Sequence, residues 1–336
     1  PPSPALPPAS LAPVSQPPGT KQRRRQYMIG LGLGLSLLLA IPLLWRWKLA
    51  DGRRNMVLVP GGEFTMGSTS EEIAAARTFC ERTVGEDCKA EYFQREPLRK
   101  VRISPFYLDI TEVTNLQFAD WLNQLPGKKV TYDRLVHDAQ NVLLADLYPP
   151  DSNGLKVQDG RITPSAGHER MPVVQVSWNA ALHYCQSQGK RLPTEAQWEF
   201  AARGSEGHRF PWGDGEPRCD GVVFGRKPGR ECASLSAGPG PVGGSEQDRS
   251  PEGIQDLGGN VSEWVMDLFR TPYESCRSVC VDPLANTPFQ KEQVKRVVRG
   301  GNWYMPGESC RAAGRNRWPP ELASPNIGFR CAQPAE

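Results

Sequence analysis

The chain has 336 residues, of which 38% are hydrophobic, and its formal net charge at pH 7 is +3. This length and hydrophobic content allow a sizeable core in one large or two small domains. The near-neutral charge, without a basic patch interleaved with aromatic residues, excludes a typical nucleic-acid-binding surface. Thirty-three glycines and 32 prolines favour a loop-rich fold over a mainly helical one.

The N-terminal part divides into a polar and an apolar stretch. Residues 1–26 are rich in Pro, Ala and Ser and end in a basic run, which predicts a disordered, Pro-rich linker. No charge lies between Tyr27 and Trp45, so we predict a transmembrane helix over 27–47 with aromatic residues at the membrane interfaces. A buried core helix is the alternative. A cleaved signal peptide is disfavoured, because no small-x-small site follows. The GxxxG spacing of Gly30 and Gly34 would allow a dimer through the span.

The cysteines indicate the side of the membrane on which the rest of the chain lies. All nine follow the predicted span, while basic residues flank it equally on both sides. No C-x₂-C zinc spacing is present. Three pairs have the short spacing of local disulfides: Cys80 and Cys88, Cys219 and Cys232, and Cys276 and Cys280. We therefore expect an oxidising compartment and an extracytoplasmic C-terminal part, periplasmic or extracellular. Free cytosolic thiols are the alternative.

The first half of the remaining chain predicts strands and one helix. Residues 56–60 and 63–66 suggest two strands around a Gly-Gly turn, and 100–109 alternates like a third strand. Thr114 is a candidate cap for a helix over 115–123. Residues 126–170 show no clear periodicity and suggest a long excursion.

The second half predicts two more helices and short closing strands. Ser177 would cap a helix over 178–188, and Thr194 with Gln197 forms a capping box for a helix that runs through Ala202. Residues 204–250 look like loop, and short strands are expected at 294–299 and 326–331. Few helices, short strands and long loops indicate an α+β fold.

Ordered sequence blocks closely resemble the formylglycine-generating enzyme, or sulfatase-modifying factor, family. The blocks are Met56-Val-Leu-Val-Pro-Gly-Gly-Glu-Phe-Thr-Met-Gly67, Gly189-Lys-Arg-Leu-Pro-Thr-Glu-Ala-Gln-Trp-Glu-Phe-Ala-Ala-Arg203, Gly258-Gly-Asn-Val-Ser-Glu-Trp264, Arg299-Gly-Gly-Asn-Trp-Tyr, Cys310-Arg-Ala-Ala-Gly-Arg-Asn-Arg and Asn326-Ile-Gly-Phe-Arg-Cys-Ala332. The resemblance implies one domain over 55–333 with an elaborated C-type-lectin-like fold, loop-rich, with short antiparallel sheets and few helices.

The enzymes of this family bind copper(I) through two cysteines that follow the Gly-Gly of the C-terminal block. Counted forward from Gly301, these positions fall on Met305 and Cys310; counted backward from Cys331, Cys310 falls beside a cysteine position. One thiolate is missing by either count, and a thioether cannot replace it. Cys310 is therefore the one catalytic candidate, and copper is expected only if the chain is catalytic. The four histidines do not cluster at metal-binding spacing.

The loop from Asp256 to Glu263, which overlaps the block from Gly258 to Trp264, resembles the family's structural calcium site. The resemblance assigns side-chain oxygens to Asp256 and Glu263 and backbone carbonyls to Gly259 and Val261. Such hard oxygen ligands suit calcium. The alternative is a plain turn whose acidic side chains are solvated.

The resemblance also implies a disulfide between Cys185 and Cys331, which leaves Cys310 unpaired. If Cys310 paired with Cys331 instead, Cys185 would be the free thiol. In the enzymes, the equivalents of Arg315 and Asn326 line the substrate cleft. With Asn302 and Trp303, they suggest a concave surface for a peptide or small polar ligand, although Arg315 could equally tie loops together.

These observations lead to one leading hypothesis and two alternatives. We expect a membrane-anchored, extracytoplasmic module that binds or senses a ligand without catalysis. By analogy with similar fused domains, it could be the C-terminal part of a bacterial serine/threonine kinase. The alternatives are a formylglycine-generating oxidase that acts on a sulfatase cysteine and a structural partner in an envelope complex.

Overall fold

The chain divides into two units, residues 1–52 and Arg53–Glu336. A computed structural model describes residues 53–147, 154–271, 273, 276, 278–287 and 294–335, all in the second unit. The predicted linker (1–26) and transmembrane helix (27–47) lie outside the described residues. Within the described ranges, no helix has the length and apolarity needed to cross a membrane.

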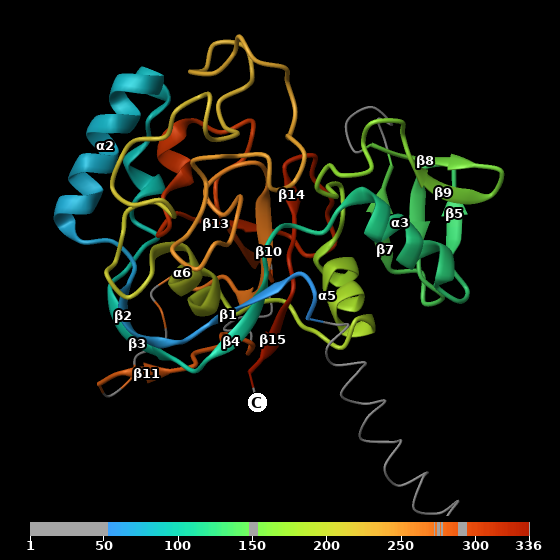
Figure 1. The fold of residues 1–336 in the computed structure, drawn as a ribbon, viewed down its shortest axis with the longest axis horizontal. Helices are drawn as coiled ribbons and strands as arrows, with labels where there is room; N and C mark the ends of the chain where they lie inside the picture. Colours follow the sequence, from blue (N-terminus) through green and yellow to red (C-terminus); the bar gives the residue numbers. More distant parts are fainter. Residues whose placement is uncertain are drawn as a thin grey trace, which may run out of the picture. The chain divides into compact units, whose positions relative to one another are not determined.

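Four α-helices and a set of short strands make up the described fold (Figure 1). The helices are α2 (Ser70–Val84), α3 (Asn115–Gln124), α5 (Trp178–Ser187) and α6 (Glu195–Arg203), with the 3₁₀ turns η1 (Gly85–Asp87), η2 (Ala90–Tyr92) and η3 (Gly307–Cys310). The strands are β1 (Met56–Val59), β2 (Gly62–Met66), β3 (Arg99–Ile103), β4 (Phe106–Asp109), β5 (Lys129–Thr131), β6 (Leu135–His137), β7 (Leu143–Asp146), β8 (Leu155–Gln158), β9 (Arg161–Pro164), β10 (Ser262–Leu268), β11 (Cys280–Val281), β12 (Arg296–Arg299), β13 (Arg315–Trp318), β14 (Ile327–Gly328) and β15 (Ala332–Pro334).

The strands form five small sheets. Their orders are β1-β4-β15, β13-β12-β10-β14, β11-β3-β2, β5-β6-β7 and β8-β9. Most pairs are antiparallel, as expected, but β10 pairs with β14 and β11 with β3 in parallel. The strand predicted over 100–109 is two strands, β3 and β4, which belong to different sheets. Pro105 lies between them and cannot donate a ladder hydrogen bond, which explains the break.

The three predicted helices are confirmed as α3, α5 and α6, each with the expected cap. The hydroxyls of Thr114, Ser177 and Thr194 accept the N–H of the third helical residue. Helix α2 was not predicted, although Thr69 and Glu72 form a capping box that signals its start. The excursion over 126–170 contains the small β5–β9 sheets beside α3 (Figure 1).

Buried ion pairs run through the middle of the fold. Five arginines, each at most 6% exposed, bond to a carboxylate: Arg203 with Glu72, Arg299 with Glu199, Arg311 with Glu96, Arg315 with Glu195, and Arg330 with Glu263. We call these five the paired arginines. Glu199 and Glu195 on α6 pair with Arg299 on β12 and Arg315 on β13, so these two pairs join the helix to the β13-β12-β10-β14 sheet. The edge strand β13 of this sheet borders the candidate site.

Candidate functional site

A cavity of 240 Å³ lies beside the edge strand β13. Four parts of the chain supply its walls: the end of η2 with the residues that follow it, the start of β10, the turn after β12, and η3 with the residues that follow it. The lining residues are Tyr92, Phe93, Arg95, Glu96, Ser262, Gly300, Asn302, Met305, Glu308, Ser309, Arg311, Gly314, Arg315 and Asn316. The cavity therefore lies where the Gly-Gly block and the C-terminal arginine block meet.

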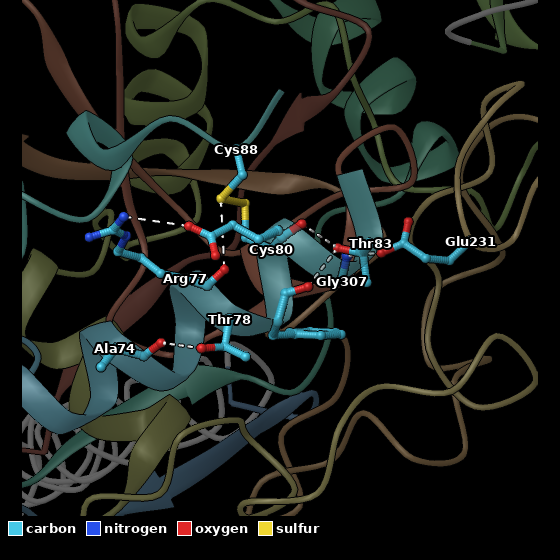
Figure 2. Close-up of a disulfide and its surroundings, with 10 residues drawn as sticks. Ala74, Arg77, Thr78, Cys80, Thr83, Cys88, Glu231 and Gly307 are labelled. Atoms are coloured by element: carbon cyan, nitrogen blue, oxygen red, sulfur yellow. Dashed lines mark hydrogen bonds and ion pairs between the residues drawn. A yellow bond between two sulfur atoms is a disulfide. The ribbon is translucent and has the colours of Figure 1, made fainter. Parts of the chain in front are cut away.

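Helix α2 and its disulfide support two of these walls (Figure 2). Cys80 near the end of α2 is bonded to Cys88, a few residues before Tyr92 and Phe93 enter the lining. On the other side, α2 packs against η3. A Cβ added at Gly307 would lie 3.0 Å from the Phe79 ring, so this glycine allows the close approach. The spacing of Cys80 and Cys88 predicted this disulfide, but not the wall that it supports.

The residues predicted to bind a ligand separate into two places. Asn302 and Arg315 line the cavity, whereas Trp303 and Asn326 are not among the lining residues. Trp303 lies beside Pro325, since its indole N–H donates to the Pro325 carbonyl at 3.3 Å. Two of the four predicted residues therefore line the cavity, and the other two lie outside its lining.

Both predicted residues in the cavity wall are already engaged. The Arg315 guanidinium bonds to both Glu195 oxygens and donates to the Arg95 carbonyl at 2.7 Å. The Asn302 side chain donates to the Ser262 hydroxyl at 2.9 Å and accepts the Tyr304 N–H at 3.0 Å. Arg315 and Asn302 therefore shape the cavity more than they offer groups to a ligand.

Glu308 supplies a polar group with spare capacity in the wall. Its side chain is 7% exposed, and its Oε2 atom has no hydrogen-bond partner within the described structure. Burial, and then the charge of Glu231, raises the pKa of the Glu308 carboxyl to about 7. Near neutral pH this group can therefore either donate or accept a hydrogen bond.

The sulfur atoms near the cavity do not form a thiolate pair. Met305 lines the cavity. Cys310 is the one cysteine outside the disulfides, and it is fully buried in a hydrophobic cluster with Phe79, Phe210 and Phe224. Burial, followed by the charge of Asp248, raises the pKa of the Cys310 thiol well above its usual value. Because copper(I) of the family type needs two thiolates, these residues do not fit that metal.

The remaining eight cysteines form the four disulfides that were expected. The pairs are Cys80–Cys88, Cys185–Cys331, Cys219–Cys232 and Cys276–Cys280. Cys185–Cys331 joins α5 to the residue before β15, and this pairing leaves Cys310 as the free thiol.

The predicted calcium loop has one unsatisfied carboxylate oxygen. Asp256 and Asn260 both have positive φ, at 58° and 61°, which folds the loop tightly between them. Asp256 is fully buried, and its Oδ1 atom has no hydrogen-bond partner among the described residues. Burial raises the pKa of the Asp256 carboxyl. An added cation would satisfy this oxygen, so Asp256 fits the expected role.

Glu263 fits the calcium role less directly. Both of its oxygens accept from the Arg330 Nε at 2.9 Å, and Oε2 also accepts the Trp198 indole N–H at 2.9 Å. A cation would have to share this carboxylate with Arg330. Across the described residues, no group of three or more His, Cys, Asp or Glu side chains has metal-binding spacing. Calcium binding by Asp256, Gly259, Val261 and Glu263 therefore stays a prediction.

Comparison with known proteins identifies a matching family model and several similar relatives. Residues 49–335 match the family model described as a sulfatase-modifying factor enzyme 1-like domain. The chain is 33% identical to a formylglycine-generating enzyme of Streptomyces coelicolor, with 84% of this chain and 90% of the relative covered. It is 31% identical to the "Inactive C-alpha-formylglycine-generating enzyme 2" of Bos taurus, with 86% and 92% covered.

Two further similarities concern a longer protein and a solved structure. The serine/threonine-protein kinase Pkn1 of Chlamydia trachomatis is 30% identical over 83% of this chain, which corresponds to 38% of the kinase. The structure of PvdO from Pseudomonas aeruginosa has a TM-score of 0.55 at 24% identity, with 83% of this chain and 94% of PvdO covered. The fold, the ordered sequence blocks and the match over 49–335 show that this chain belongs to the sulfatase-modifying factor, or formylglycine-generating enzyme, family.

Proposed function

We propose that this chain is a non-catalytic, ligand-binding member of the family. The proposal rests on the absence of a thiolate pair at the cavity. The one free thiol, Cys310, is fully buried, and a thioether, Met305, lies in the cavity wall. A buried thiol with a raised pKa is a poor nucleophile and a poor metal ligand. The relative named as inactive supports the idea that the fold can be used without the chemistry.

The cavity beside β13 is the proposed binding site for a peptide or small polar ligand. Arg95 is half-buried in its wall, and its pKa is lowered by burial and then by the charge of Arg317. An anionic ligand group would relieve both effects. The exposed Asn316 and the partner-free oxygen of Glu308 provide further polar contacts, while Tyr92 and Phe93 give the apolar surface that such pockets need.

We also propose that the domain is extracytoplasmic and anchored by residues 27–47. Four disulfides in one domain support an oxidising compartment. The similarity to Pkn1 supports coupling of such a domain to a serine/threonine kinase. Thiol labelling in intact cells tests the topology: Ser236→Cys should react with an impermeant reagent and Ser15→Cys should not. The reverse pattern would contradict the proposed orientation.

The second candidate is a formylglycine-generating oxidase, favoured by 33% identity to an enzyme of that name over 90% of its length. A sulfatase-type peptide with one cysteine, incubated with the copper-treated full chain, separates the two functions. We expect no aldehyde, measured by hydrazide labelling and mass spectrometry, while the Streptomyces coelicolor relative serves as the positive control. An aldehyde that disappears in the Cys310→Ser variant would establish the oxidase and end the non-catalytic proposal.

A further inference from the structure

Glu112, a buried acid outside the predicted site residues, lies next to the predicted calcium loop. It is on the segment between β4 and α3 and is 1% exposed. Its Oε1 atom accepts a side-chain N–H of Asn260 at 3.0 Å, which ties Glu112 to the loop from Asp256 to Glu263. Its Oε2 atom is buried and has no hydrogen-bond partner among the described residues. One half of this carboxylate is therefore left without a donor.

Asp256 in that loop has the same arrangement. Its Oδ2 atom accepts the Gly243 N–H, and its Oδ1 atom is buried without a partner in the described structure. The Asp256 and Glu112 side chains are within hydrogen-bonding distance of each other. Because the other oxygen of each carboxylate already has its own donor, the two unsatisfied oxygens are the ones left to share a partner.

A contact between two carboxylates requires a positive charge between them. Carboxylate oxygens are acceptors only, so no hydrogen bond joins these groups while both are ionised. Like charges at this distance repel each other, and burial strengthens the repulsion. Either a proton or a cation must therefore bridge Glu112 and Asp256.

The surrounding charges favour a cation. Two further acids are close enough to interact with this pair: Asp248 with Asp256, and Glu263 with Glu112. All four are at most 1% exposed. Arg330 stabilises the charged form of each, but its guanidinium is bound to Glu263 and to four backbone carbonyls. The single charge of Arg330 thus serves four carboxyl groups. A shared proton would remove one negative charge, whereas a divalent ion offsets two.

The contact between the two acids also suits a shared ion. Calcium binds oxygen at about 2.3–2.6 Å, so two oxygens in one coordination shell are themselves roughly 3–4 Å apart. Two carboxylates in hydrogen-bonding contact are at such a distance. Within the described ranges, no third His, Cys, Asp or Glu side chain completes a metal-binding group. The remaining ligands would be carbonyls or waters, which calcium commonly accepts.

We propose that Glu112 is the second carboxylate ligand of a calcium ion bound at Asp256, in the place that the family resemblance assigns to Glu263. Glu263 keeps both oxygens on Arg330, and its Oε2 atom also accepts the Trp198 indole N–H, so it stays part of the scaffold. Glu112 has an unsatisfied oxygen for the ion, and its bond to Asn260 already holds it against the loop. The proposal does not depend on the function proposed for the cavity.

Calcium titration of the full chain in detergent tests the assignment. The probe is calcium chloride added to chelator-treated protein, followed by isothermal titration calorimetry and by the melting temperature. The wild-type chain should bind calcium and melt at a higher temperature with it. Glu112→Gln should weaken calcium binding at least about tenfold, because it removes one charged ligand.

The fold should tolerate Glu112→Gln. The new amide oxygen can still accept from Asn260, and the new amide N–H can donate to Asp256 Oδ1. In chelator, this variant should therefore melt at the wild-type temperature or above, while calcium should no longer raise its melting temperature. If it does not fold, Glu112→Asp replaces it. That change keeps the charge but withdraws the carboxylate by one methylene, and calcium affinity should fall by a similar factor.

Asp138→Asn is the matched control. It also neutralises a buried acid, which is 6% exposed. The asparagine oxygen can keep the bonds that Asp138 accepts from the Gln140 and Val142 N–H groups. Calcium affinity should not change in this variant.

Three results would overturn the assignment. Calcium binding that Glu112→Gln or its Glu112→Asp replacement leaves unchanged would return the second ligand position to Glu263, even if Asp256→Asn abolishes binding. A wild-type chain that binds no calcium would mean that Glu112 and Asp256 share a proton only. An equal loss of affinity in Asp138→Asn would mean that any buried charge change weakens binding. None of these results bears on the aldehyde assay, so this proposal and the proposed function can fail separately.

Discussion

The arginines around the cavity and Arg226 differ in what neutralises them. Arg311 and Arg315 each hold two bonds to a buried glutamate, whereas Arg226 donates to a backbone carbonyl and has no carboxylate partner among the described residues. An arginine whose donors are satisfied inside the protein contributes to the scaffold. An arginine such as Arg226 is held within the described structure by a backbone carbonyl instead of an ion pair.

The same comparison extends to the carboxylates. Glu195 and Glu263 are each paired with a buried arginine, whereas Asp256 and Glu308 each keep a buried oxygen without a partner in the described structure. The unpaired groups lie in the predicted calcium loop and in the cavity wall. Substitutions that remove paired and unpaired groups should therefore have clearly different effects.

The largest effect is expected from Arg315→Ala. This change leaves Glu195 buried without its closest cation, so the free energy of unfolding should fall by about 3–5 kcal/mol. Denaturant unfolding of the full chain measures the loss. Arg218→Ala, which breaks an exposed pair, should cost at most about 1 kcal/mol. Unchanged stability with weakened ligand binding would instead return Arg315 to the ligand-contacting role that the sequence suggested.

A smaller effect is expected from calcium. An ion that satisfies Asp256 Oδ1 should stabilise the folded chain by about 2.7 kcal/mol at 100 times its dissociation constant. Thermal melts with calcium and with chelator measure the difference. Asp256→Asn should abolish the response, while Asp220→Asn, at an exposed position, should retain it. This test avoids Glu263, whose substitution would also break the pair with Arg330. Melting that is indifferent to calcium would leave Asp256 as a plain buried acid.

Local sequence signals predicted much of the fold because the signals are themselves local. Thr114, Ser177 and Thr194 cap the helices that follow them, and the capping hydroxyl reaches only to the third helical residue. The same signal at Thr69 preceded α2 and was overlooked. The break between β3 and β4 at Pro105 could also have been inferred from the missing N–H donor.

The candidate site could be predicted only in part, because it depends on contacts between distant residues. The family blocks contain Arg315, Asn302 and Glu195, but they do not reveal that Glu195, 120 residues before Arg315, binds its guanidinium. The cavity wall that carries Phe93 and Arg95 depends on how α2 packs against η3. Arg226 stands in no block, and its lack of a counter-ion becomes visible only in three dimensions.

The smallest effect concerns Glu308 and the pH dependence of stability. Burial and the charge of Glu231 raise the pKa of this carboxyl to about 7 in the folded chain, from an ordinary value of 4.5. The folded state therefore binds the proton more tightly than the unfolded state does. The contribution of Glu308 is fully favourable below about pH 4.5, declines as the pH rises towards 7, and is constant above that.

Glu308→Gln should flatten this decline, because the amide stays neutral at every pH. Asp248 and Asp267 also have pKa values raised to about 7, so their contributions to stability decline in the same direction, and only the difference between variant and wild type reports Glu308. Chemical unfolding at intervals from pH 4 to pH 8 measures that difference, with the exposed Glu246→Gln as the charge-matched control. A variant curve parallel to the wild-type curve would mean that Glu308 has the same pKa in the folded and in the unfolded chain, near its ordinary value of 4.5. In that case the cavity would offer its ligand a negative charge at neutral pH, and cationic ligands would become the ones to test first.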